Sequence, residues 1–194
     1  DREGCTYHGN GVVTAPAGFK EAYAQFIANG WPSLGCDPGF GGQGLPTIVN
    51  NRLYEMWNSA NQAWTMYAGL SHSAYECLHA FGTDEQKSQW LEKIASGEVV
   101  ASFALTEPGA GSNPSGLRTK AVLDGDDWVI NGEKCFITNA PSADLFVTFA
   151  RTRPADADGP GIAVFLVPAD TPGVVVGPKD AKMGQEGAWT AGVS

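Results

Sequence analysis

The chain has 194 residues, 43% of them hydrophobic, enough for one packed domain and part of a second. Its net charge of −9 argues against a nucleic-acid partner, because contact with phosphates needs clustered lysines and arginines. No run of about 18 apolar residues could span a membrane.

Apolar residues recur at helical spacing through the first half of the chain. Pro16 can open one helix and Gly30 can close it, and Pro46 can open a second. Residues 64–81 are nearly all apolar, which predicts a long buried helix. Thr83, with Gln three positions later, forms the capping-box pattern that opens a further helix.

The period changes to β-type runs after Gly97, with turn signals at 124–126, 131–132 and 158–159. We therefore expect an α+β chain. An all-α N-terminal domain at residues 1–97 precedes an antiparallel β domain at 98–194.

A glycine-rich loop follows the short β-branched run at residues 99–105. Pro108 stops strand pairing because it has no N–H to donate. The small residues from Gly109 to Ser112 let the backbone approach a ligand closely, and successive N–H groups in such a loop can bind an anion. A surface turn between two strands is the better explanation of this segment when it is considered alone.

A second segment, KCFITN at residues 134–139, reads as a strand. Regular alternation places Phe136 and Thr138 on one face, where an aromatic platform and a hydroxyl suit a flavin ring. An ordinary half-buried strand with Phe136 in the core is the alternative.

Together these segments resemble the acyl-CoA dehydrogenase family. LTEPGAGS, then G-x-K-x-F-I-T-N, ADLFVTFART, GIAVFLVP and KMGQEGA are similar to its middle domain. FGGQGL, SANQAW and FGTDEQKSQWLEKIASGE resemble its helical N-terminal domain. The resemblance begins near Pro16 and implies a β-barrel-like middle domain that binds FAD.

The resemblance assigns roles to individual residues. Phe103, Leu105 and Thr106 would meet the flavin pyrimidine edge. Gly111 and Ser112 would lie at the pyrophosphate, with Ser112 also near the thioester substrate. The isoalloxazine ring would contact the residues of the second segment, Phe136, Ile137 and Thr138, with Thr138 near N5.

Two positions depart from the family pattern. Asn113 replaces the usual Asp; it keeps a side-chain acceptor for the turn, so we expect the loop geometry to survive. Phe136 often corresponds to Trp. The N-terminal half also resembles the longer members that act on methylthiopropionyl-CoA, whereas the loop motifs resemble general fatty acyl-CoA members, so the acyl group stays open.

The reaction implied is removal of an α-proton by a carboxylate while hydride passes from the β-carbon to flavin N5. In the family this base is a Glu in a C-terminal helical domain, which we expect to lie outside this chain. Glu107 belongs to the strand-exit motif and is no substitute. A flavin oxidase or monooxygenase on the same scaffold, or a non-catalytic binding fragment, are the alternatives.

The resemblance also implies partners and a compartment. The partners are an acyl-CoA substrate, electron-transferring flavoprotein as electron acceptor, and other copies of the chain in a dimer or tetramer. The four cysteines contain no C-x-x-C pair, which fits a reducing intracellular setting, bacterial cytoplasm or mitochondrial matrix. The chain starts at Asp1 without a charged-then-apolar leader, so we expect a fragment or a processed product.

Three other patterns are weaker. Gly39, Gly41 and Gly44 match G-x-G-x-x-G, but no strand precedes them, so we expect a connecting loop. Ser71 lacks the G-x-S-x-G context of a hydrolase. His72 and the other two histidines do not form a metal-ligand set.

Overall fold

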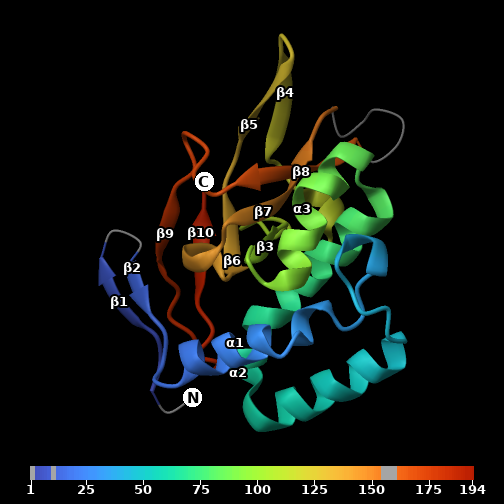
Figure 1. Cartoon of the computed structure of the whole chain (residues 1–194). Coiled ribbons are helices and arrows are strands. Elements are labelled where there is room, and N and C mark those ends of the chain that lie inside the picture. The colour runs from blue at the N-terminus through green and yellow to red at the C-terminus, as the bar shows by residue number, and fades with distance from the viewer. Residues whose placement is uncertain (1–2, 10–11, 154–160) are drawn as a thin grey trace.

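The computed structural model describes residues 3–9, 12–153 and 161–194 (Figure 1). The turn signal at 158–159 lies outside them. The helices are α1 (Phe19–Ala28), α2 (Thr47–Phe81) and α3 (Asp84–Ser96), with short 3₁₀ turns η1 (Trp31–Ser33), η2 (Pro38–Phe40), η3 (Pro114–Gly116) and η4 (Ala140–Ser142). The strands are β1 (Thr6–Gly9), β2 (Val12–Thr14), β3 (Ala101–Ala104), β4 (Lys120–Asp124), β5 (Asp127–Asn131), β6 (Lys134–Thr138), β7 (Leu145–Arg151), β8 (Ile162–Pro168), β9 (Val176–Lys179) and β10 (Thr190–Val193).

Helix α2 is kinked at Asn61, whose φ of −160° and ψ of 96° are not helical. The Asn61 side chain accepts a hydrogen bond from the backbone N–H of Trp64 at 3.2 Å, so it acts as an N-cap for the second half. That half buries one stripe and leaves Phe81 86% exposed. The prediction of a helix over 64–81 is confirmed, and its burial is limited to one stripe.

The capping box of α3 is present as predicted. Gln86 N–H donates to Thr83 Oγ1 at 3.3 Å, and Thr83 N–H donates to Gln86 Oε1 at 3.0 Å. Gly97 ends the helix with a φ of 79°, the left-handed conformation that glycine adopts without strain. Leu91, fully buried, joins α3 to a core shared with α2, β3 and β7.

The N-terminal part is not all-α. Strands β1 and β2 pair in an antiparallel hairpin that precedes the helices. The backbone N–H of Cys5 donates to the carbonyl of Glu186 at 2.9 Å, and Tyr7 packs on Trp189 with ring centroids 5.4 Å apart. This hairpin is stabilised by residues far along the chain, which local sequence patterns do not reveal.

The β part forms two open sheets. One has the order β3-β7-β4-β5, with β8 also paired to β7, and the other has the order β6-β10-β9. Neither sheet closes on itself in the described part of the chain, so the barrel-like expectation is not confirmed. A cavity of about 630 Å³ is lined by residues from both sheets, including Trp128, Phe146 and Val193.

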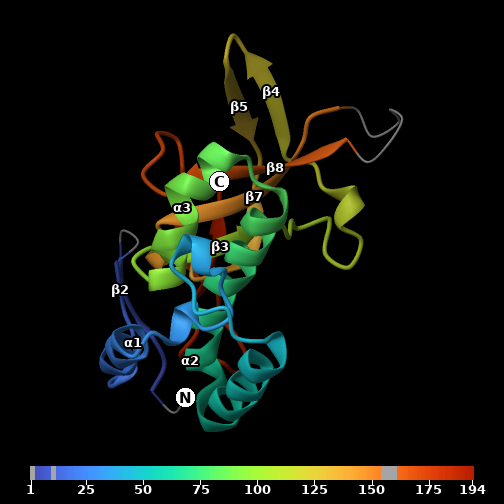
Figure 2. The ribbon, with the colours of Figure 1, turned by 45° about the vertical axis from the view of Figure 1, so that its right-hand side comes forward.

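The expectation of a wholly antiparallel β domain is also wrong. Strands β3 and β4 both pair with β7 in parallel, β4 only through Lys120 and Arg151. The long crossover between β3 and β7 allows this direction, because parallel neighbours cannot be joined by a tight turn. The predicted turn at 124–126 does join the antiparallel pair β4 and β5, which stands away from the remaining strands (Figure 2).

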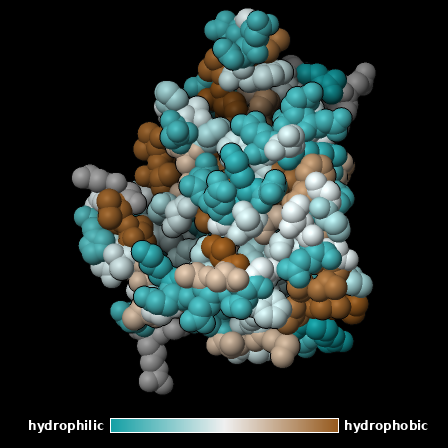
Figure 3. All heavy atoms as spheres, viewed as in Figure 1, coloured by the Kyte–Doolittle hydropathy of each residue, from teal (hydrophilic) through white to brown (hydrophobic). Residues whose placement is uncertain are grey.

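The tip of the β4–β5 hairpin is hydrophilic, and hydrophobic residues gather below it (Figure 3). Val122, Leu123, Trp128 and Val129 are about half exposed there, at 60%, 56%, 46% and 45%. The hairpin therefore carries apolar side chains that are only partly covered by the described residues.

Candidate cofactor site

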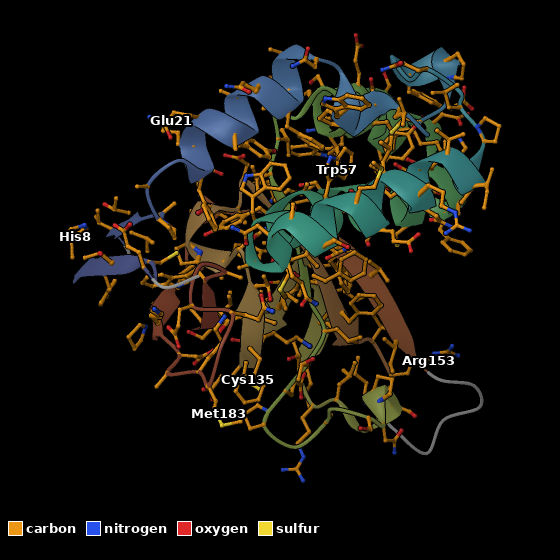
Figure 4. All side chains as sticks on the ribbon, turned by 90° about the horizontal axis from the view of Figure 1, so that it is seen from below. His8, Glu21, Trp57, Cys135, Arg153 and Met183 are labelled. Atoms are coloured by element: carbon orange, nitrogen blue, oxygen red, sulfur yellow. The ribbon has the colours of Figure 1, made fainter. Side chains whose placement is uncertain are left out.

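The two segments singled out in the sequence lie side by side. Ser102 Oγ donates to the carbonyl of Thr138 at 2.5 Å, and the backbone N–H of Cys135 donates to the carbonyl of Thr106 at 2.9 Å. These two bonds join β3 and the segment that follows it to the two ends of β6. Figure 4 shows Cys135 at the end of the β part that lies far from Trp57 of α2.

Strand β6 contains a β-bulge between two inward-facing residues. Its register with β10 shifts, so that Ala191 opposes Ile137 whereas Val193 opposes Lys134. Phe136 lies in the bulge with a φ of 58° and is 68% exposed. The expected simple alternation is therefore broken. The alternative that places Phe136 in the core is wrong, because the bulge turns its ring outward.

The glycine loop begins with a tight turn. Glu107 and Ala110 exchange two backbone hydrogen bonds, at 3.1 and 3.0 Å, with Pro108 and Gly109 exposed between them. Gly111 and Ser112 follow on the surface. A Cβ added at Gly111 would meet no protein atom within 4 Å, so the backbone there is open to a ligand. Asn113 Oδ1 accepts a hydrogen bond from Ser115 Oγ at 2.6 Å, so this Asn does order the turn.

A buried ion pair lies behind both segments. Lys134 Nζ is 2.8 Å from Glu107 Oε1, and the two side chains are only 4% and 6% exposed. Lys134 also donates to the carbonyls of Leu105 at 3.2 Å and Phe149 at 2.7 Å. All three ammonium protons thus have acceptors.

Glu107 is equally well satisfied on its other side. It accepts from the backbone N–H groups of Arg118 at 2.5 Å and Thr119 at 3.0 Å, and from Thr119 Oγ1 at 2.5 Å. Burial by itself raises the pKa of Glu107, but the hydrogen bonds from Lys134, Thr119 and the Arg118 backbone outweigh it and lower the pKa to about 2. Glu107 is therefore an anion that closes the base of the loop.

Sequence reasoning missed the role of Lys134. The only local signal is a charged residue in a strand that is otherwise apolar or hydroxyl-bearing. Lys134 pairs with Glu107, which lies 27 positions earlier in the sequence, and the partner is identified only by the three-dimensional structure.

The remaining predicted site residues divide by exposure. Phe103 is half-buried and packs against Phe149, with ring centroids 5.9 Å apart. Leu105, Thr106 and Thr138 are half-buried at the junction of the two segments. Ile137 is only 2% exposed and lies in the core with Trp189, so its side chain faces away from this surface.

The weaker patterns have structural roles. Gly39 lies in η2, and Gly41 and Gly44 lie in the loop between η2 and α2. Ser71 Oγ accepts from the backbone N–H of Ala101 at 3.1 Å, and burial lowers the pKa of His72, whose Nε2 is 3.1 Å from Asn50 Nδ2. Burial likewise raises the pKa of Cys135, so this thiol stays protonated near the site.

Metal-binding clusters and membrane-spanning helices are both absent from residues 3–9, 12–153 and 161–194. No group of three or more His, Cys, Asp and Glu residues is placed to hold a metal ion. No helix in those ranges has the length and apolar character needed to cross a bilayer.

Helices packed against open β sheets, with a glycine loop that starts beside strand β6, place the chain in the α+β class. The acyl-CoA dehydrogenase N-terminal domain model matches residues 13–98, and the acyl-CoA dehydrogenase middle domain model matches residues 102–194. The chain belongs to the acyl-CoA dehydrogenase family.

Individual relatives agree with this assignment. A probable acyl-CoA dehydrogenase of Bacillus subtilis is 41% identical over 154 residues, 78% of this chain and 40% of the relative. The 3-methylmercaptopropionyl-CoA dehydrogenase of Ruegeria pomeroyi is 36% identical over 173 residues, 87% of this chain and 29% of the relative. A glutaryl-CoA dehydrogenase of Mycobacterium smegmatis, solved in complex with FADH2, superposes with a TM-score of 0.80 at 32% identity, covering 89% of this chain and 43% of that one. The chain spans less than half the length of these relatives.

Proposed function

We propose that this chain supplies the FAD-contacting surface of an enzyme that oxidises an acyl-CoA thioester to a 2-enoyl-CoA. The observation that carries the proposal is the convergence of residues 102–106 and 134–138 on one surface, joined by the hydrogen bonds of Ser102 and Cys135. The relatives named above act on acyl-CoA thioesters by their names, and one of them was solved with reduced FAD.

The residues present fit a flavin nucleotide. Phe136 offers an aromatic face that the protein itself leaves 68% exposed, against which a planar ring can pack. The Gly111 backbone and the Ser112 hydroxyl are accessible on the adjoining loop, which suits the negatively charged pyrophosphate. Thr138 lies two positions from Phe136 and can donate a hydrogen bond to the ring. Bound FAD would supply the hydride acceptor.

The proton-transfer step needs a carboxylate that this surface does not offer. Glu107 is held as a buried anion by Lys134 and has no route to a substrate α-proton. We therefore assign Glu107 to structure and place the base in a part of the protein beyond these 194 residues. We further propose electron-transferring flavoprotein as the electron acceptor and a homo-oligomeric assembly, both from membership of the family.

A pair of matched aromatic variants tests the flavin surface in the complete protein that contains this chain. Phe136→Ala should weaken FAD binding several-fold, since a stacked aromatic contributes about 1 kcal/mol. Phe81→Ala removes an even more exposed ring, at 86%, on a different element and should leave FAD affinity unchanged. Affinity is measured by quenching of flavin fluorescence, and equal affinity in both variants and the parent would contradict the proposal.

Turnover is tested separately. The FAD-loaded protein is mixed, in the absence of oxygen, with acyl-CoA thioesters of different chain length and with 3-methylthiopropionyl-CoA. The true substrate should bleach the flavin absorbance. An FAD-loaded protein that no acyl-CoA bleaches, but that consumes oxygen with another reductant, would favour the oxidase alternative.

A further inference from the structure

The buried pair formed by Glu107 and Lys134 is hydrogen-bonded to the backbone on both sides of the glycine loop. Lys134 holds the carbonyl of Leu105 at the exit of β3, and Glu107 holds the N–H groups of Arg118 and Thr119 at the far end of the glycine loop. Residues 108–117 are therefore closed into a loop whose two ends meet at one carboxylate.

The pair also explains the bulge in β6. In a regular strand, side chains on the same face are separated by an even number of residues. Lys134 must point inward to reach Glu107, and Ile137 points inward to the core at 2% exposure, yet these positions are three apart. One extra residue has to be accommodated between them, and the register shift opposite Ala191 and Val193 shows where.

The residue accommodated in the bulge is the one that faces outward. With Lys134 inward, uninterrupted alternation would turn Phe136 inward and Ile137 outward. The bulge instead gives Phe136 a φ of 58°, a conformation that costs a non-glycine residue free energy, and exposes its ring. The bulge thus lets Lys134 reach Glu107 while Ile137 stays inward and Phe136 outward, and it is what gives Phe136 its left-handed backbone.

We propose that Glu107 and Lys134 are positioning residues, which set both the mouth of the glycine loop and the bulged backbone conformation of Phe136. This inference rests on the proposed function, because it states how the flavin surface is held in shape. Neither residue touches the ligand, so the pair acts through Leu105, the loop and the bulge.

The test replaces the pair by a neutral one of similar size, Glu107→Gln with Lys134→Met, in the complete protein. Exchanging a buried ion pair for uncharged residues is often close to neutral for stability, so the double variant is expected to fold. Its FAD dissociation constant should rise at least about tenfold, and the visible circular dichroism of bound flavin should change, because both contact segments are released. Thr119→Val removes one donor to Glu107 and provides a milder variant with an expected loss of several-fold.

A matched control separates positioning from general stability. Leu91→Ala opens the shared core at a residue with 0% exposure, away from the loop and the bulge. It should lower the melting temperature and leave FAD affinity unchanged when measured well below that temperature. The positioning role is refuted if the pair variants lose no more FAD affinity than Leu91→Ala does for the same drop in melting temperature. It is also refuted if their FAD affinity stays at the parent value.

A second readout does not need the cofactor. Arg118 is exposed at the end of the loop, and trypsin cleavage after it reports how firmly the loop is closed. The double variant should be cut there at least about tenfold faster than the parent, and Leu91→Ala should not. A parent protein that binds no FAD would refute the proposed function, whereas unchanged cleavage at Arg118 in the double variant would refute the positioning role.

Discussion

Acid should destabilise this protein through Glu107 more than through any exposed carboxylate. The pKa of Glu107 is lowered from 4.5 to about 2 in the folded state, where it is hydrogen-bonded to Lys134, Thr119 and the Arg118 backbone. A depressed folded-state pKa means that the ionised group stabilises the fold above the unfolded pKa. That stabilisation is lost as the pH falls from about 4.5 toward 2.

The magnitude follows from the shift. A difference of one pKa unit corresponds to about 1.4 kcal/mol. The parent protein should therefore lose roughly 3 kcal/mol of unfolding free energy over the full window, of which roughly 2 kcal/mol is lost by pH 3. Glu107→Gln cannot titrate and leaves Lys134 buried without its anion. It should cost roughly 3–5 kcal/mol at pH 7, and this cost should shrink by roughly 2 kcal/mol at pH 3.

The assay is urea unfolding of parent and variant at pH 7, 5, 4 and 3, followed by the fluorescence of the 6 tryptophans. The quantity compared is the difference in unfolding free energy between parent and Glu107→Gln, because the other 20 acidic residues are common to both proteins. A difference that stays constant from pH 7 to pH 3 would show that Glu107 is not held as a low-pKa anion.

Four further outcomes are expected. Thr138→Val should slow flavin reduction several-fold while FAD is retained, since one hydrogen bond contributes about 1 kcal/mol; an unchanged rate in stopped-flow absorbance would contradict the proposed contact at the flavin N5. Gly111→Val should abolish FAD retention with no loss of thermal stability, because a Cβ at this position meets no protein atom within 4 Å. Gly132→Val should instead unfold more easily, because a Cβ there would lie 2.7 Å from a backbone atom. Thr83→Ala should cost about 1 kcal/mol in urea unfolding through loss of the α3 cap. Residues 1–194 alone should show no dye reduction with butyryl- or octanoyl-CoA, and robust turnover would mean that the base lies within them.

Features that depend on neighbouring residues were determined by the sequence. The box formed by Thr83 and Gln86, the stop at Gly97 and the hairpin turn at 124–126 each require only a few consecutive side chains, and all three are present. The loop and strand motifs also identified the family, because their residue types recur in order along the chain.

Features that depend on distant partners were decided only by the tertiary structure. Parallel pairing of β3 with β7, the open sheets and the β1–β2 hairpin follow from packing between segments that local periodicity does not relate. The site shows the same limit most clearly. Alternation along β6 predicted the same face for Phe136 and Thr138, and it gave no sign of the bulge between Lys134, which points inward to Glu107, and Ile137, which points inward to the core. A strand's period is local, whereas the direction in which its side chains must point is set by partners elsewhere in the fold.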